Sequence, residues 1–323
     1  MSANVRVGVD IGGTSVKLGA IDAAGAILGE RTIEIPAELR EAGARATDAS
    51  VAALFDAIVE AAVALGATDC LGVGVPGLLD RAHGGVVTSP NLRYLEGRSI
   101  VDEFQRRLGG GTVILENDAN LAALGEVRVG GARGARNALV VTLGTGVGGG
   151  LILNGELFIG EGAAGEIGHV VVDPDDDEPA TGLRGSIENR ASATAAMRRA
   201  RAAGMTDDLE ALSELARRAP GRERTLLEAI GEDLGHGLGA ARMLLDLDTF
   251  VFGGGFANAL DLLEPGIRRG MAARDFGTRA GELRILAAEL GNRAGWIGAA
   301  CLCQCPASSS GPIATSSPAT PPR

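Results

Sequence analysis

The chain has 323 residues, which is the length of one large domain or two ordinary ones. Its 30 basic and 41 acidic residues give a net charge of −11, a field that repels nucleic acid and anionic membranes, so neither is expected as a partner. Glycine is unusually abundant, with 50 residues, but it forms short clusters without the three-residue period of collagen. Lys17 is the one lysine in the sequence, since every other basic residue is arginine.

The sequence also predicts where in the cell the protein works. The N-terminal segment has neither the basic nor the apolar region of a signal peptide, and no run of 18 apolar residues would span a membrane. Four cysteines, most of them near the C-terminus, are too few and too bunched for a disulfide framework, which favours the reduced cytoplasm. The segment 306–323 is rich in Pro, Ser and Thr and is expected to be disordered.

In chain order, the first third of the sequence predicts an α/β domain with a mixed sheet. Three β-rich runs separated by glycine turns suggest an antiparallel meander, and helices alternate with strands after it. The predicted strands are 5–10, 15–22, 26–35, 70–75 and 112–116, and the predicted helices are 47–65, 101–108 and 117 to about 128.

The pattern then restarts, which predicts a duplicated fold with a cleft between its halves. Strands are expected at 138–143, 149–153, 156–160, 249–252 and 284–288, with an extended segment at 166–173. Helices are expected at 188–203, 207–218, 223–246, 260–273 and 293–303. The expected domains are 1–116, joined by the C-terminal helix at about 292–304, and 117–291.

Two glycine loops each follow a strand and precede another strand. In the first, Gly12, Gly13 and Thr14 expose backbone N–H groups suited to phosphate oxygens, and Asp10 before them could hold Mg²⁺ through water. The alternative for this loop alone is a plain hairpin turn. The second loop contains Gly144, Thr145 and Gly146 in a G-x-G-x-x-G pattern, but a hairpin follows instead of the helix that dinucleotide binding needs. Two such loops facing across a cleft would bind a polyphosphate from both sides.

A third glycine cluster and three polar residues complete the candidate site. Gly254 and Gly255 follow a strand. Without side chains, their backbone could contact a flat ligand; the alternative is that glycine is needed there for close packing of the strand against a helix. Asp118, where a buried strand passes into a helix, is either an N-cap or a general base for a hydroxyl nucleophile. Glu166 and His169, separated by Ile-Gly, have the chemistry of sugar-hydroxyl ligands, although a lone histidine is more often structural.

Taken together, these segments resemble the ROK family (repressor, open reading frame, kinase), especially its glucokinase-like sugar kinases. The resemblance covers about residues 5–304, with its motifs at 10–17, 72–77, 89–92, 116–120, 143–150, 165–169 and 253–255, all in family order. It implies an actin/hexokinase-like (ribonuclease H-like) fold, ATP, Mg²⁺ and phosphoryl transfer to a hexose hydroxyl, in a homodimer or homotetramer. Asp118 would be the base; the sugar ligands would be Asn117, Glu166, His169, Glu188 and, more weakly, Asn91. The ATP-binding set would be Asp10, Gly12, Gly13, Thr14, Lys17, Gly144, Thr145, Gly146, Gly254 and Gly255.

The sequence departs from the family at its zinc segment. The family pattern Cys-x-Cys-Gly-x-x-Gly-Cys-x-Glu aligns here with Pro179, Thr181 and Ser186 at the cysteine positions, so only His169 of the four ligands remains. We therefore expect no structural zinc and a Glu188 that is positioned by loop packing. The acidic run 173–178 lacks the glycine of a calcium loop and is expected to be solvated.

Several alternatives stay open. The expected reaction is γ-phosphoryl transfer from ATP to glucose, giving glucose 6-phosphate. The acceptor could instead be an N-acetylhexosamine, fructose or an inositol, and the donor could be polyphosphate. A sugar-responsive repressor would need a DNA-binding segment before the first strand, and a non-catalytic sugar-binding relative would have lost the base or a phosphate loop. The roles of Cys301, Cys303 and Cys305 are not assigned by the sequence.

Overall fold

The fold contains two five-stranded sheets of the same topology, one in each half of the chain. A computed structural model describes residues 5–89, 91–176, 182–274 and 283–303. The sheet orders are β3-β2-β1-β4-β7 and β10-β9-β8-β11-β12. In each sheet the first three strands are antiparallel and the last two join in parallel. The predicted duplicated α/β fold is thereby confirmed. The segment 306–323, and with it the prediction of a disordered tail, lies outside the described residues, as do Pro179 and Thr181.

The first sheet is built from the early strands and covered on one face by helices. Its strands are β1 (Arg6–Ile11), β2 (Ser15–Ile21), β3 (Ile27–Glu34), β4 (Cys70–Val75) and β7 (Thr112–Asn117). The covering helices are α1 (Ala37–Ala42), α2 (Asp48–Ala64) and α3 (Ile100–Leu108), whose apolar sides enter one core with the sheet. Phe55 of α2 and Phe104 of α3 pack edge to face with ring centroids 4.9 Å apart, which fixes the two helices against each other.

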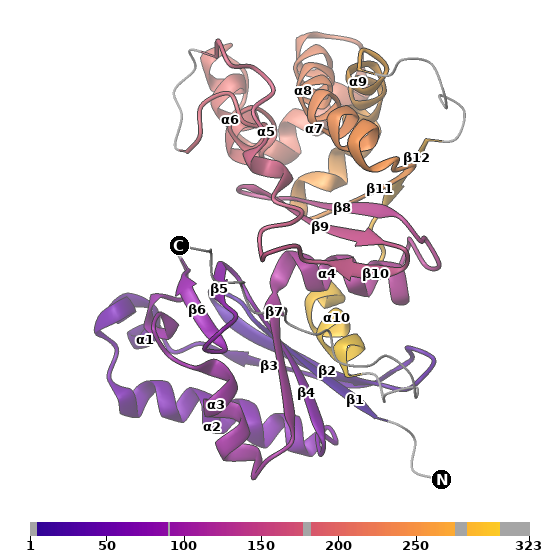
Figure 1. The fold of residues 1–323 in the computed structure, drawn as a ribbon. Coiled ribbons are helices and arrows are strands. Elements are labelled where there is room, and N and C mark those ends of the chain that lie inside the picture. Colours follow the sequence, from indigo (N-terminus) through magenta and orange to yellow (C-terminus); the bar gives the residue numbers. More distant parts are fainter. Residues whose placement is uncertain (1–4, 90, 177–181, 275–282, 304–323) are drawn as a thin grey trace, which may run out of the picture.

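The second sheet has its own core under a larger helical layer. Its strands are β8 (Ala138–Leu143), β9 (Val147–Leu153), β10 (Glu156–Phe158), β11 (Thr249–Gly253) and β12 (Arg284–Ala287). The layer contains α5 (Ile187–Ala191), α6 (Ala193–Ala202), α7 (Leu209–Arg218), α8 (Arg222–Leu245) and α9 (Leu260–Ala272). Figure 1 shows this layer on the side of the second sheet that faces away from the first sheet.

Two helices lie between the sheets and connect the halves: α4 (Asp118–Arg128) and α10 (Ala294–Leu302) (Figure 1). They approach so closely that a Cβ at Gly298 would stand 1.8 Å from the carbonyl oxygen of Leu121. A Cβ at Gly8 of β1 would stand 2.0 Å from the carbonyl oxygen of Trp296, so α10 also lies directly on the first sheet. Helix α10 thus packs on the N-terminal sheet, and the start of α4 is held between the halves.

Some elements differ from the predictions. The expected helix 188–203 is two helices, because Ser192 leaves the helical backbone and its side chain caps α6 by accepting the N–H of Ala195. The expected extended segment 166–173 begins with a 3₁₀ turn, η3 (Ile167–His169). Helix α1 and the hairpin of β5 (Leu78–Asp80) and β6 (Gly85–Thr88) were not predicted, because they are too short for a periodic pattern.

The cysteines give a correction. Cys70 at the start of β4 and Cys303 just after α10 form a disulfide across a sequence separation of 233 residues, with Cα atoms 5.6 Å apart. The spacing of the cysteines in the sequence did not predict this pair, because the two residues meet only when α10 packs on the first sheet. Cys301 is a free, buried thiol. Within the described ranges, no helix is long and apolar enough to cross a bilayer.

Candidate active site

A cavity of about 1300 Å³ collects most of the predicted site residues. It lies where the C-terminal ends of β1 and β7 meet the start of β9 and the loop before η3. The predicted residues that line it are Asp10, Lys17, Asn91, Asn117, Asp118, Gly144, Thr145, Gly146, Glu166, His169, Glu188 and Gly254. Gly12, Gly13, Thr14 and Gly255 are not among its lining residues, so the first glycine turn flanks the cavity and does not form its wall.

The first glycine loop places its charged residues on the cavity side. Asp10 and Lys17 are register partners across the β1–β2 hairpin, and the turn between them closes with a hydrogen bond from the Gly12 N–H to the Ser15 carbonyl, at 3.0 Å. Thr14 at the tip is exposed. Gly13 lies against Asn91: a Cβ there would stand 3.2 Å from the Asn91 Cβ. The first glycine turn therefore lies directly beside Asn91, one of the predicted sugar ligands.

Asp10 is held in an environment that disfavours its charge. Burial raises the pKa of its carboxyl to about 7, with a further increase from the Asp118 charge and an opposing effect from Lys17. Its carboxylate abuts Gly295, where a Cβ would stand 2.4 Å from the Asp10 Oδ2. A hard carboxylate oxygen beside a second carboxylate fits a Mg²⁺ ion, because the cation would relieve the repulsion between them.

This environment predicts a pH-dependent stability. Between the ordinary Asp pKa of 3.8 and about 7, the unfolded chain has lost the Asp10 proton while the folded, metal-free protein retains it, so stability falls as pH rises through this window. We expect Asp10→Asn to increase the free energy of unfolding at pH 8 by a few kcal/mol at most, which raises the melting temperature, and to change both little at pH 4. Thermal melts of both proteins without Mg²⁺ check this; an equal shift at the two pH values would contradict it.

Asp118 begins α4 at the cavity wall, but it is not the residue that caps the helix. Asn117 is the N-cap: its Oδ1 accepts the N–H groups of Ala119 and Asn120 at 2.9 and 3.3 Å. Asp118 accepts the Ala119 N–H at 2.9 Å, and the Asn117 side chain also hydrogen-bonds its carboxylate. Burial raises the pKa of Asp118, the Glu166 charge adds to the increase, and the hydrogen bond from Ala119 opposes it. A carboxylate with a raised pKa is suited to accept a proton.

The segment before Asp118 is fixed by an ion pair that the sequence did not reveal. Arg81, after β5, donates to both oxygens of Glu116 at 2.9 and 2.8 Å. The buried Glu116 also accepts from the Asn117 N–H and from the Asn120 side chain, at 2.8 and 2.9 Å. Glu116 stands in the 116–120 motif, but nothing in the sequence pairs it with an arginine 35 residues earlier. The network orients the strand end that presents Asp118.

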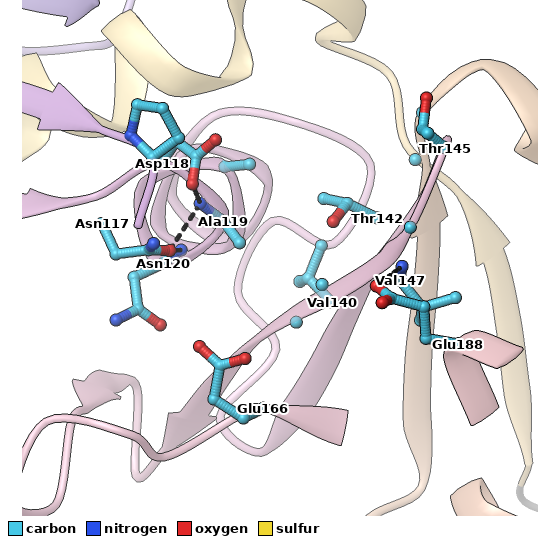
Figure 2. A pocket seen from close by; sticks show the side chains of 18 of the residues that line it. Asn117, Asp118, Ala119, Asn120, Val140, Thr142, Thr145, Val147, Glu166 and Glu188 are labelled. Atoms are coloured by element: carbon cyan, nitrogen blue, oxygen red, sulfur yellow. Dashed lines mark hydrogen bonds between the residues drawn. The ribbon is translucent and has the colours of Figure 1, made fainter. Parts of the chain in front are cut away.

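The second glycine loop is tied to Glu188. The Glu188 Oε2 accepts the Val147 N–H at 3.0 Å, and a Cβ at Gly146 would stand 2.3 Å from that same oxygen. Thr145 is exposed at the loop tip, and its carbonyl accepts the Thr194 hydroxyl at 2.8 Å. Figure 2 shows Glu188 beside Val147 at one end of the loop. Glycine at 146 is therefore needed for a carboxylate to reach the loop backbone.

The remaining predicted residues lie on either side of this loop. Gly254 has φ +87°, and a Cβ there would stand 2.3 Å from the Leu143 carbonyl oxygen, so the second and third glycine clusters adjoin. Glu166 and His169 are exposed, with 3.7 Å between the His169 Nε2 and the Glu166 Oε2. In Figure 2 the carboxylates of Asp118 and Glu166 face the same space from opposite sides.

The expectation of a solvated loop at 173–178 is wrong for Asp176, although Pro174 and Asp175 are exposed. Asp176 is buried, with 1 % of its side chain exposed, and its carboxylate lies 2.9 Å from Arg190. Arg190 also contacts Asp173 at 3.0 Å and Asp233 of α8 at 3.2 Å, and Arg199 contacts Asp233 at 2.8 Å. These five residues, called the Arg190 cluster below, join the loop to α5, α6 and α8. No group of three or more His, Cys, Asp or Glu that could hold a metal ion occurs among the described residues.

Two glycine loops and an acidic helix start around one cavity, in a duplicated fold, define a protein of the actin/hexokinase-like class. A family model described as "ROK family" matches residues 6–305. The chain is 32% identical to a glucokinase of Streptomyces coelicolor over 322 residues, which cover 94% of this chain and 98% of the relative. The chain belongs to the ROK family.

Solved structures agree with this assignment. A ROK hexokinase from Thermus thermophilus is similar with a TM-score of 0.76 and 30% identity, covering 92% of this chain and 96% of that one. A ROK family glucokinase from Streptomyces griseus, in complex with glucose and AMPPNP, is similar with a TM-score of 0.70 and 30% identity over 93% of this chain and 99% of that one. The family resemblance and the fold class predicted from the sequence are confirmed.

Proposed function

We propose that this protein is an ATP-dependent hexose kinase that transfers the γ-phosphoryl group to the 6-hydroxyl of glucose. One observation carries the proposal: Asp118, a carboxylate with a raised pKa, lines the same cavity as the glycine loop at 144–146 and the Asp10–Lys17 pair. The base and the phosphate-binding elements of a kinase therefore face one space. The similarity to glucokinases, one of them in complex with glucose and AMPPNP, favours glucose over the other acceptors.

The donor side would bind ATP through the glycine loops. Gly144 and Gly146 offer backbone N–H groups with no side chain in the way, Thr145 adds a hydroxyl, and Gly254 leaves bare backbone for the nucleoside. Lys17 supplies positive charge from across the cavity. Asp10 would hold Mg²⁺, which when bound neutralises charge that develops on the transferred phosphoryl group. Gly12, Gly13 and Thr14 flank this region and would contact the phosphates after the halves close on the ligand.

In the part of the cavity that would hold the sugar, carboxylate and imidazole groups would form hydrogen bonds with the sugar hydroxyls. Glu166, His169 and Glu188 line the cavity, and the Asn91 side chain lies beside the first glycine turn. Asn117 lines the cavity as well; its side-chain amide donates to the Gly77 carbonyl at 3.2 Å and hydrogen-bonds Asp118, so it would contact the sugar next to the base. Asp118 would accept the proton of the attacking hydroxyl as the phosphoryl group moves to the sugar oxygen.

A coupled ADP-release assay tests the proposal. Glucose is expected to give the highest kcat/KM in a panel with mannose, fructose, N-acetylglucosamine, N-acetylmannosamine and inositol. Polyphosphate as donor releases no ADP, so the two donors are compared by the rate of glucose 6-phosphate formation, which is expected to be higher with ATP. Glucose 6-phosphate should accumulate in step with ADP. Absence of sugar-stimulated ADP release would overturn the kinase proposal, whereas a preference for another hexose would overturn only the glucose assignment.

Three further properties belong to this proposal. The enzyme would work in the cytoplasm, where ATP and glucose are available, and it would form a homodimer or homotetramer, which analytical ultracentrifugation tests. It would need no structural zinc, because Ser186 occupies one of the family's cysteine positions and the Arg190 cluster holds the segment that carries Glu188.

A further inference from the structure

A second cavity, of about 270 Å³, lies at the end of α4 opposite Asp118. Its described lining comes from the first residue of β1, from the end of β2 with the turn into β3, from the end of α4 with the loop that follows, and from α10. Three of its lining residues are arginines, Arg6, Arg128 and Arg133, and none is a carboxylate. The chain has a net charge of −11, so a cavity lined by three arginines is a locally positive region of a negatively charged protein.

Two of these three arginines have no carboxylate partner among the described residues. Many arginines of this protein contact a carboxylate, as Arg217 contacts Asp261 at 2.7 Å. Arg6 and Arg133 have no side-chain hydrogen bond or ion pair with any residue that the structure describes. Arg128 has one, from its Nη2 to Glu156 at 3.0 Å. The Nε atoms of Arg6 and Arg128 are both buried without an acceptor. A buried, unsatisfied N–H is costly, and the described residues around the cavity supply no acceptor for these two.

We propose that this cavity binds a phosphate group, either inorganic phosphate or the phosphate of a monoester. A guanidinium donates two parallel N–H groups to phosphate oxygens, and three of them match a doubly charged tetrahedral anion better than a single carboxylate. The half-negative C-terminal end of α4 opposes an anion here, but three full positive charges outweigh it. Cys301 closes the cavity from α10 and is near enough to the guanidinium groups for Arg6 and Arg128 to affect its thiol.

The position of the cavity makes such a site regulatory. Arg6 belongs to the first sheet, whereas Arg128 and Arg133 belong to α4 and the segment that leads into β8. An anion between them would link the two halves of the fold at the point where α4 crosses α10. Because Asp118 is the first residue of α4, occupancy of the cavity would bias the relative position of the halves around the catalytic cleft. This regulatory role rests on the proposed kinase function, whereas the binding itself does not.

Calorimetric titration of inorganic phosphate tests the binding. The protein is first saturated with glucose and AMPPNP, so that the catalytic cleft is filled, and ionic strength is kept constant with chloride. We expect one phosphate per chain, with the Kd weakened at least about tenfold in Arg6→Gln and in Arg133→Gln. Arg45→Gln, at an exposed arginine far from the cavity, is the matched control and should bind as the wild type does. Circular dichroism of each variant checks that it folds.

The outcomes separate this site from the kinase proposal. A parallel titration with glucose 6-phosphate distinguishes the two sources, because a tighter Kd identifies the monoester as the occupant and a weaker one identifies free phosphate. Absence of phosphate binding in the wild type, or equal Kd values in the wild type and both arginine variants, overturns the site. Loss of binding in the variants supports it even if no sugar is phosphorylated, since the measurement needs no turnover.

Discussion

Asp118→Asn is expected to bind glucose with nearly unchanged affinity and to turn over at least about a hundredfold more slowly. The amide has the shape of the carboxyl group and can still accept the Ala119 N–H, so the start of α4 keeps its hydrogen bond. It cannot take the proton of the sugar hydroxyl. Removing the carboxylate also removes a charge that raises the pKa of Asp10, so the fold should be at least as stable as before.

The test measures glucose binding and turnover separately. Calorimetry gives the glucose Kd, and the coupled assay gives kcat at saturating glucose and ATP. Asp102→Asn, at an exposed aspartate of α3, is the matched control and should keep the wild-type kcat. A kcat within a few-fold of the wild type in Asp118→Asn would remove this residue from the role of base, and a large loss of glucose affinity would assign it to binding.

The local parts of the fold and site were predictable from the sequence. Strands such as β1 and β8 are short apolar runs that end in glycine, and each glycine loop is contiguous in the chain. Asp118 could be singled out because a buried strand passes directly into a helix there. The duplicated order of strands predicted both loops at one cleft; in the structure the second loop and the Asp10–Lys17 pair line the cavity, and the first glycine turn flanks it.

What the sequence could not reveal depends on contacts between distant segments. Neither the disulfide of Cys70 nor the pairing of Arg81 with Glu116 has a local pattern, since each partner becomes a neighbour only after the sheet forms. The sequence offered Asp118 as either the N-cap or a general base, and only the hydrogen bonds show that Asn117 caps the helix. The acidic run at 173–178 was expected to be solvated because its arginine partner, Arg190, follows more than ten residues later.

Arg190→Met is expected to lower both the stability of the protein and its affinity for sugar. Arg190 is 15 % exposed and lies between three carboxylates. Burial lowers the pKa of the guanidinium, but the charges of Asp233, Asp176 and Asp173 outweigh it, so the net pKa of Arg190 is raised. Removing the cation would leave the buried Asp176 without its main counter-charge, which costs about 3–5 kcal/mol. We expect the melting temperature to fall accordingly.

The effect on sugar follows from the position of Glu188 two residues earlier in α5. Glu188 reaches the Val147 N–H only while α5 and the loop at 170–176 are fixed together, and Asp176 helps to fix them by accepting the Gly185 N–H at 3.1 Å. We therefore expect the KM for glucose to rise at least about tenfold, with a smaller change in kcat and in the KM for ATP. A purely structural role would reduce the amount of active enzyme and leave both KM values unchanged.

Three comparisons make the Arg190 prediction decisive. Arg201→Met removes an exposed arginine of α6 that pairs with Asp207, and it should change neither stability nor KM by much, because exposed ion pairs contribute little. Arg190→Lys should recover part of the stability, since it restores the charge but not the fork of donors that reaches Asp173, Asp176 and Asp233 together. If the Arg190 cluster alone holds the segment that carries Glu188, elemental analysis should find no zinc in the active wild type. Stoichiometric zinc, or an unchanged glucose KM in Arg190→Met, would refute that role.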